Sequence, residues 1–354
     1  MTTTLMVLDK DDLMGGTQAT PSYHHVVEDS TTGHQVWGHA IAVEYDAWNN
    51  SDPVYTVASG QKPHFPNAQH QDTIYVGAIV PNGSIWGYIA HPITGVDLPE
   101  WFDNETSAAT PGGNVTLIAR SFLHATYRPD SQVGGRILTC HHIRDTTGGT
   151  NPQPVGGYYI RWYEIHTNGW PNTSNVPTIA SYGDIKFENL ETYDPSIAVN
   201  AAGHIALTWT QSGPNLYPEF WMGVQRSFDP PGVLGYTRRI QTSSTIRAVG
   251  IGHKADYSGI DPDPEDPCRF WGHSMLAPST SEWDTHVGVL CVPDCDADSY
   301  ADQDANQEYD AFDLLIYSER FRAGDPRADC NGDRVLNVLD YLCFNSLFSA
   351  GGRR

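Results

Sequence analysis

Two twelve-residue stretches near the carboxyl end carry oxygen-bearing residues at the spacing that a calcium-binding loop requires. Calcium takes six to eight oxygen ligands at about 2.3–2.6 Å, and loop positions 1, 3, 5, 7, 9 and 12 wrap these oxygens around one ion, position 7 through its backbone carbonyl. The sequence therefore predicts two calcium ions, one in each loop. The predicted ligands are Asp302, Asp304, Asn306, Glu308, Asp310 and Asp313 in the first loop, and Asp329, Asn331, Asp333, Val335, Asn337 and Asp340 in the second.

Both loops depart from the usual pattern at two positions. Position 6 normally holds glycine for a sharp turn, but here it holds Gln307 in the first loop and Arg334 in the second. A left-handed non-glycine residue costs about 1–2 kcal/mol, so we expect weakened calcium affinity, and more so beside the positive charge of Arg334. Position 12 holds aspartate instead of the longer glutamate, which shortens the reach of a bidentate ligand.

An apolar segment follows each loop, and its spacing predicts a helix. Apolar residues at offsets of one, four and eight from the last ligand share one helical face. A disordered tail is the alternative, because residues 294–340 hold 13 Asp and Glu against 4 Arg, and blocks of like charge are typical of solvated segments. Matching apolar segments behind two matching ligand sets favour folded loops, in which the ion relieves repulsion among the carboxylates. The segments contain Leu314, Leu315, Ile316, Tyr317 and Phe321, and then Tyr341, Leu342, Phe344, Leu347 and Phe348.

This duplicated arrangement, over about residues 294 to 350, resembles the dockerin module of secreted bacterial polysaccharide-degrading systems. That module has aspartate at position 12 and lacks the entering helix of a full EF-hand. The resemblance implies a small α-helical pair of calcium loops that docks onto a cohesin-like or cell-envelope protein. In that family, positions 10 and 11 help choose the cohesin and are often small hydroxyl residues. Here they are Ala311 and Phe312, then Val338 and Leu339, which departs from the family's recognition pattern.

Cysteine usage predicts a crosslink in the C-terminal region. Four of the six cysteines fall near the carboxyl end, where a small domain gains most from a disulfide. A disulfide among these four is expected, but six cysteines allow fifteen connectivities. Zinc is the competing interpretation, and the spacings do not form the two short cysteine pairs typical of zinc sites. The cysteines are Cys140, Cys268, Cys291, Cys295, Cys330 and Cys343.

The length of the chain limits the number of domains, and its net charge limits the classes of partner. A chain of 354 residues is long enough for two domains, which we place at residues 1–290 and 291–354. A net charge of −22 repels phosphate backbones and anionic lipid surfaces, so we expect no nucleic-acid partner. No stretch approaches the ~18–20 apolar residues of a membrane span, so we expect no membrane insertion.

The calcium loops and the amino-terminal sequence favour different localisations. Residues 1–9 lack the basic segment and long apolar core of a secretory signal. Weak acidic loops suit the millimolar calcium found outside cells, whereas intracellular levels would leave them empty. We therefore expect a secreted, extracellular protein whose sequence begins downstream of its true start.

The first 290 residues are predicted to be all-β. Gly, Pro, Asn, Asp, Ser and Thr punctuate short runs rich in β-branched and aromatic residues, which is the pattern of strands. Clear strand candidates are Val36–Val43, Thr73–Val80, Asn114–Ile118, Arg136–Cys140, Tyr158–Ile165, Ile205–Thr210 and Val287–Val292.

A repeated strand, turn and strand unit indicates the architecture. Residues Asp194–Thr210 contain an apolar strand, a glycine turn and a second strand, and Asp256–Trp271 echo them loosely. Units of this kind suit propeller blades of ~40–50 residues, so about six blades would use the available length. An array of β-sandwiches is the alternative. The expected fold is therefore mainly β, a propeller followed by the helical calcium-loop pair.

The same segments, with Arg161–Ile165 and Trp283–Gly288, are similar to large, mostly uncharacterised secreted bacterial proteins with propeller-like repeats of sialidase-like architecture. In such proteins a stretch like Thr4–Gly16 lies inside a blade. The resemblance therefore implies a propeller that is incomplete at its amino end. It implies nothing about chemistry.

Motifs for catalysis are absent from the sequence. It has no sialidase Asp-box, no Gly-x-Ser-x-Gly elbow, no His-Glu-x-x-His helix and no glycine-rich phosphate loop. His141 and His142 cannot join one site, because adjacent strand residues face opposite sides of a sheet. The acidic residues between Asp261 and Asp266 suit a turn better than a further calcium site. We therefore predict no catalytic residues.

Three functional hypotheses remain. The leading one is a secreted, non-catalytic propeller with a dockerin-like tail that docks it onto an extracellular assembly or the cell envelope. The second is a glycan-active hydrolase, sialidase-like or another glycosidase, which needs two carboxylates about 5–9.5 Å apart in one pocket. The third makes the tail a purely structural calcium clasp. Ten Trp and 18 Tyr also offer stacking surfaces for carbohydrate, although such rings more often pack between strands.

Overall fold

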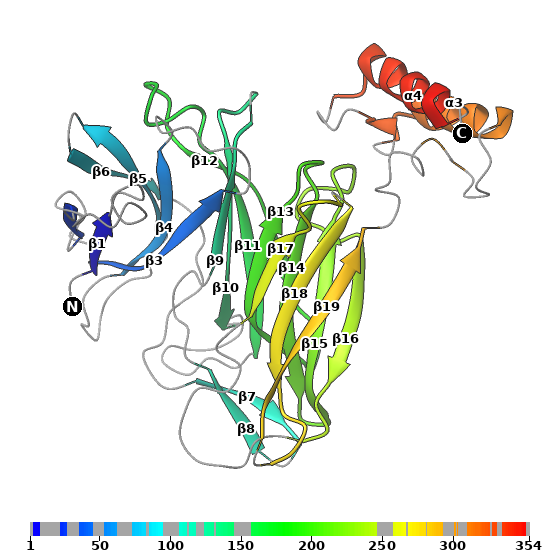
Figure 1. Cartoon of the computed structure of the whole chain (residues 1–354). Helices are drawn as coiled ribbons and strands as arrows, with labels where there is room; N and C mark the ends of the chain where they lie inside the picture. The colour runs from blue at the N-terminus through cyan, green and yellow to red at the C-terminus, as the bar shows by residue number, and fades with distance from the viewer. Residues whose placement is uncertain are drawn as a thin grey trace.

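The protein is mainly β, with two helices at its carboxyl end (Figure 1), as a computed structural model of the chain shows. The residues that the structure describes are 3–7, 22–26, 35–44, 53–61, 73–82, 85–94, 106–111, 113–117, 124–130, 132–144, 157–245, 258–266, 268–280, 282–292, 301, 303, 310–325, 328–330 and 335–351.

The described strands form a series of antiparallel meanders, in which neighbours in sequence are neighbours in the sheet. A short hairpin, β1 (Thr3–Val7) and β2 (Ser22–Val26), comes before them. The first meander contains β3 (Gln35–Glu44), β4 (Val54–Gln61), β5 (Thr73–Asn82) and β6 (Ile85–Thr94). The second contains β9 (His124–Arg128), β10 (Arg136–Arg144), β11 (Tyr158–His166) and β12 (Thr178–Ile185).

Two more meanders follow in sequence. The third contains β13 (Glu191–Val199), β14 (Ile205–Gly213), β15 (Leu216–Gln225) and β16 (Tyr236–Thr242). The fourth contains β17 (Gly259–Pro262), β18 (Arg269–Leu276) and β19 (Asp284–Cys291). In the sequence, a hairpin of β7 (Thr106–Thr110) and β8 (Gly113–Leu117) comes between the first and second meanders.

The first strands of successive meanders lie beside one another. β3 pairs with β9 in parallel, through Ala42 with Ala125 and Val43 with Thr126, and so joins two meanders into an eight-stranded sheet. β13 then packs against β9, and β17 packs against β13. The meanders are therefore stacked in sequence order with their first strands gathered together (Figure 1).

Three apolar cores separate the four meanders, and alternation along the strands explains them. On β11, Tyr163 points into the core shared with the first meander, whereas Trp162 points into the core shared with the third. On β13, Ile197 joins that second core and Ala198 joins the core shared with the fourth meander. Because successive strand residues face opposite sides, a strand covered on both faces is buried along nearly its whole length, as β11, β13 and β14 are.

The prediction of a mainly β fold is confirmed, and every strand candidate named above overlaps an observed strand. The segment Asp194–Thr210 forms β13, a turn at Gly203 and β14, as predicted. A closed propeller is not seen, because the sheets formed by the described strands do not join into a ring.

The two helices that the apolar spacing predicted are also present. They are α3 (Ala311–Ala323) and α4 (Val338–Gly351), and they follow the last strand in sequence. Neither is long and apolar enough to cross a membrane, and the same holds for every helix among the described residues.

Candidate metal centre

Side chains of the first predicted calcium loop hold the start of α3. Asp310, at loop position 9, is the N-cap and accepts a hydrogen bond from the Phe312 amide (2.7 Å). Asp313, at position 12, accepts one in return from the Asp310 amide (2.9 Å). This capping box satisfies amides that have no partner within the helix, and it places negative charge at the positive end of the helix dipole.

The second loop repeats this arrangement at the start of α4. Asn337, at position 9, accepts a hydrogen bond from the Leu339 amide (2.8 Å). Asp340, at position 12, accepts one from the Asn337 amide (2.8 Å). Because the same loop positions make the same hydrogen bonds in both loops, the sequence repeat is also a structural repeat.

Three of the predicted ligand carboxylates are buried. Asp313 and Asp340 have no exposed surface, and Asp329 is 7% exposed. Asp313 also accepts a hydrogen bond from the Gln303 amide (2.6 Å), which brings loop position 2 to position 12. Buried carboxylates are costly unless hydrogen bonds or a cation compensate them, and backbone amides supply such hydrogen bonds to Asp313 and Asp340.

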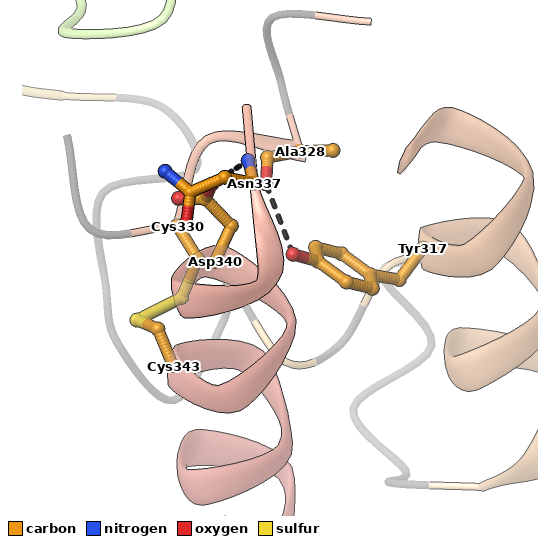
Figure 2. Close-up of a disulfide and its surroundings, with 6 residues drawn as sticks. All are labelled: Tyr317, Ala328, Cys330, Asn337, Asp340 and Cys343. Carbon is orange, nitrogen blue, oxygen red and sulfur yellow. Dashed lines mark hydrogen bonds between the residues drawn. A yellow bond between two sulfur atoms is a disulfide. The ribbon is translucent and has the colours of Figure 1, made fainter. Parts of the chain in front are cut away.

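The two helices pack through equivalent aromatic residues. Tyr317 and Phe344 both follow their position-12 ligand by four residues, and their rings stack with centroids 3.8 Å apart. The Tyr317 hydroxyl donates to the Ala328 carbonyl (2.9 Å), beside the first residue of the second loop (Figure 2). Burial, and then the nearby Asp340, Tyr341 and Asp329, raise the pKa of Tyr317 above its ordinary value. Tyr317 from α3 therefore lies close to predicted ligand carboxylates of the second loop.

A disulfide fastens the second loop to α4. Cys330, at loop position 2, is bonded to Cys343 (Figure 2), which confirms the prediction of a disulfide among the C-terminal cysteines. Cys268 is also disulfide-bonded. Among the described cysteines, Cys140 is buried and free, and Cys291 is exposed and free. Sulfurs joined in a disulfide are not thiolates, and thiolates are the form that binds zinc.

Large apolar side chains remain exposed at equivalent positions of the two helices. Phe312 and Leu339, at position 11, are 64% and 54% exposed. Leu315 and Leu342, three residues later, are 56% and 60% exposed. The face that the offsets predicted contains Tyr317 and Phe344, which are buried. The exposed residues therefore form a second apolar face, which the apolar spacing did not predict.

The structure describes six of the twelve predicted ligands. At position 7 of the second loop, the Val335 carbonyl accepts a hydrogen bond from the Asn337 side-chain amide (2.7 Å), so positions 7 and 9 lie together. Within the described part of the chain, no three His, Cys, Asp or Glu side chains gather as a metal site requires. The described ligands are Asp310, Asp313, Asp329, Val335, Asn337 and Asp340. The predicted ligands outside the described residues are Asp302, Asp304, Asn306, Glu308, Asn331 and Asp333.

The chemistry of the described donors suits calcium. Every predicted ligand that is described offers oxygen, from a carboxylate, an amide or a carbonyl. Hard cations such as calcium prefer oxygen ligands, whereas zinc prefers nitrogen and sulfur. The described residues thus fit calcium in donor type.

The histidine pair of β10 divides between two cores, as predicted. His141 lies 3.3 Å from the Tyr163 hydroxyl on the side of the first meander. His142 accepts a hydrogen bond from the Asp194 amide (3.2 Å) on the side of the third. Burial, and then His142 and Arg161, lower the pKa of His141 to about 3. The two imidazoles therefore do not share a site.

The acidic segment before β18 forms a turn, which agrees with the interpretation from the sequence. Asp263 accepts hydrogen bonds from the amides of Glu265 (2.9 Å) and Asp266 (3.2 Å), and from the Trp271 indole (2.8 Å). Hydrogen bonding, first from Trp271, lowers the pKa of Asp263. This carboxylate therefore caps a turn and anchors a tryptophan.

Comparisons with known proteins identify no family. No family model matches the chain, and a search of curated proteins gave no match. One solved structure that resembles it is a protein of unknown function from Dyadobacter fermentans DSM 18053. The two chains are 12% identical, and the alignment covers 82% of this chain and 69% of that one, with a TM-score of 0.40.

Proposed function

We propose that this is a secreted docking protein, in which a dockerin-like pair of calcium loops attaches a propeller-like β scaffold to a separate extracellular or cell-envelope protein. The observation that carries the proposal is the equivalence of the two C-terminal loops. In both, position 12 is a buried carboxylate, whereas positions 11 and 14 present large apolar side chains to solvent. One face of the repeat thus suits an ion, and the other suits a protein.

Calcium binding would stabilise the C-terminal region. Asp329, Asp340 and Asp313 are buried ligand carboxylates, and a bound divalent ion would supply the positive charge that offsets their burial. Folding and ion binding are coupled when a site requires neighbouring carboxylates to approach one another. The helices would therefore be most stable in extracellular calcium.

The exposed apolar face would be the docking surface. The exposed apolar side chains of this face would be buried by a partner, whereas exposing them to water does not stabilise the module alone. They are Phe312, Leu315, Leu339 and Leu342. Contiguous exposed apolar surface typically marks a protein interaction site. Because large apolar groups occupy the places where the dockerin family often has hydroxyl groups, the partner we expect is a cohesin-like protein with an apolar binding surface.

The strand region would be a scaffold of propeller type. The four stacked meanders with gathered first strands are the arrangement that propeller blades adopt. Each middle meander is covered on both faces by its neighbours. This packing supports propeller-like blades, which we propose as the finer description of the mainly β fold.

Calorimetric titration of the full-length protein with calcium tests the proposal. We expect two ions to bind in the ~0.1–1 mM range of extracellular modules. The pair Asp313→Asn and Asp340→Asn removes charge from both position-12 ligands with little change of shape, so it should abolish binding. Asp284→Asn, an exposed acidic residue at the start of β19, is the matched control and should bind like the wild type.

Docking is tested with the same protein in calcium against a panel of purified cohesin modules, by biolayer interferometry. Leu339→Ser with Leu342→Ser should weaken binding at least about tenfold, because it removes buried apolar area. Val233→Ser, which changes an exposed apolar residue of the β scaffold, should not. Calcium binding without any cohesin binding would favour the structural clasp. The absence of calcium binding would overturn the proposal entirely.

A further inference from the structure

A pocket of about 660 Å³ lies in the β region, away from the predicted calcium loops in sequence. It opens where the β7–β8 hairpin meets the start of β11 and the segment that joins β12 to β13. Its volume falls within the ~300–1,000 Å³ range of small-molecule sites. The lining residues that matter here are Tyr158, Tyr159, Lys186, Phe187, Glu188 and Glu191.

Glu191 holds two walls of the pocket together. One carboxylate oxygen accepts a hydrogen bond from the Ala109 amide of β7, and the other accepts one from the Tyr158 amide of β11 (3.3 Å). The hairpin is fixed a second time, because the Ser212 hydroxyl of β14 donates to the Ala109 carbonyl (2.8 Å). Hydrogen bonds between separate strands therefore build the pocket before any ligand arrives.

The aromatic residues of the pocket are held in place by their neighbours. Tyr158 packs into a core with Tyr193, and its ring meets His142 edge to face. The Tyr159 ring lies under the Lys186 ammonium group, which is 5.0 Å from its centroid. Phe187 is 45% exposed, so its ring is accessible to a ligand. A rigid wall with one accessible ring faces the pocket.

The charges of the lining restrict the class of ligand. Two carboxylates, Glu188 and Glu191, outnumber the single ammonium group of Lys186, and the whole chain has a net charge of −22. An anionic ligand would be repelled. A cationic ligand would compete with Lys186, which already lies on the Tyr159 ring. A fully apolar ligand would desolvate three charged groups without compensation.

We propose that this pocket binds a neutral oligosaccharide. Hydroxyl groups both donate and accept, so one sugar ring can bond to the Glu188 carboxylate and to the Lys186 ammonium group. The positive C–H face of a sugar ring suits the negative face of the Phe187 ring. This inference does not rest on calcium binding or docking, because none of the lining residues belongs to the C-terminal loops.

The test uses the full-length protein and an array of neutral oligosaccharides of the cello, xylo, manno, malto and galacto series. The best ligand is then titrated by calorimetry. We expect Phe187→Ala, and separately Lys186→Met, to weaken its binding at least about tenfold, which corresponds to about 1.4 kcal/mol. Trp283→Ala, an exposed tryptophan outside the lining, should change affinity less than about twofold.

Unchanged tryptophan fluorescence of Phe187→Ala and Lys186→Met will show that both variants are folded. An acidic probe, tetragalacturonate, should bind at least about tenfold more weakly than the best neutral oligosaccharide, because of the charge of the site and the chain. Three results would each overturn the inference. They are no binding of any neutral oligosaccharide, binding that Phe187→Ala and Lys186→Met leave unchanged, and stronger binding of the acidic probe. None of these three results depends on the outcome of the calcium titration, so the two proposals can fail separately.

Discussion

At the scale of single residues, buried ionisable groups occur both in the C-terminal loops and in the strand region of the described chain. Asp313 and Asp340 of the loops accept hydrogen bonds from backbone amides. His142 of the strand region lies 3.6 Å from the Asp194 carboxylate. His141 instead lies beside the neutral Tyr163 hydroxyl, and its burial makes it a source of pH-dependent stability.

His141 should destabilise the fold in acid. Its pKa is lowered to about 3 in the folded protein, against about 6.5 in the unfolded chain. Between these values the unfolded state binds a proton that the folded state does not, so the free energy of unfolding falls as the pH drops from about 6.5 towards 3. The slope is up to about 1.4 kcal/mol per pH unit. Above pH 6.5 this contribution is constant.

Urea unfolding, followed by tryptophan fluorescence at a series of pH values, measures this effect. His141→Gln should flatten the dependence between pH 3 and 6.5 by about one proton. His273→Gln, on the half-buried face of β18, serves as the control. Equal pH slopes for wild type and His141→Gln would show that His141 does not remain neutral in the folded protein.

At the scale of elements, the two C-terminal loops are equivalent in hydrogen bonding but not in covalent support. The second loop is tied to α4 by the Cys330–Cys343 disulfide. The corresponding position 2 of the first loop is Gln303, which interacts with Arg320 of α3 through a hydrogen bond instead. The second loop should therefore keep its shape without calcium better than the first.

Removing the disulfide should loosen α4 selectively. Closing a loop of about 15 residues by a disulfide contributes about 3 kcal/mol in the chain-entropy model, and Cys330 and Cys343 are 13 residues apart. In calcium-free buffer, Cys330→Ser with Cys343→Ser should accelerate hydrogen exchange in α4 more than in α3, as measured by mass spectrometry. Cys291→Ser, at an exposed free cysteine, is the control. Equal acceleration in both helices would contradict the asymmetry.

At the scale of the whole molecule, the stacked meanders depend on close approach between neighbouring sheets. Gly183 of β12, in the second meander, faces Gly232 in the turn between β15 and β16 of the third. A Cβ atom at position 183 would lie 2.2 Å from the Gly232 carbonyl oxygen and 2.7 Å from the Trp162 indole nitrogen. Backbone cannot yield as a flexible side chain can, so only glycine fits between these two meanders.

Gly183→Ala should therefore destabilise the strand region by about 1–3 kcal/mol, the usual cost of overpacking. All ten tryptophans precede residue 290, so the urea midpoint by tryptophan fluorescence reports on the strands alone. Gln241→Ala, at an exposed position of β16, should leave that midpoint unchanged. If the Gly183→Ala midpoint equals the wild-type value, the two meanders do not approach as closely as the structure places them.

The amino-acid sequence determined the local features, because these depend on residues close together in the chain. Alternation and β-branched runs marked β5, β11 and β14, and the residues behind Asp313 and Asp340 marked α3 and α4. The capping role of position 9 also follows from local chemistry, since a side-chain oxygen before a helix accepts an amide hydrogen two or three residues later.

Only the tertiary structure decided which distant residues meet, because local patterns carry no information on long-range pairing. It joined β3 to β9 in parallel, paired Cys330 with Cys343, and closed a pocket with Glu191 between β7 and β11. Six cysteines allow fifteen complete pairings in sequence, whereas the structure bonds Cys330 to Cys343 and leaves Cys140 and Cys291 free. Tertiary packing also decided that Phe312 and Leu339 are exposed, because the stacking of Tyr317 on Phe344 sets which faces of the two helices turn inward.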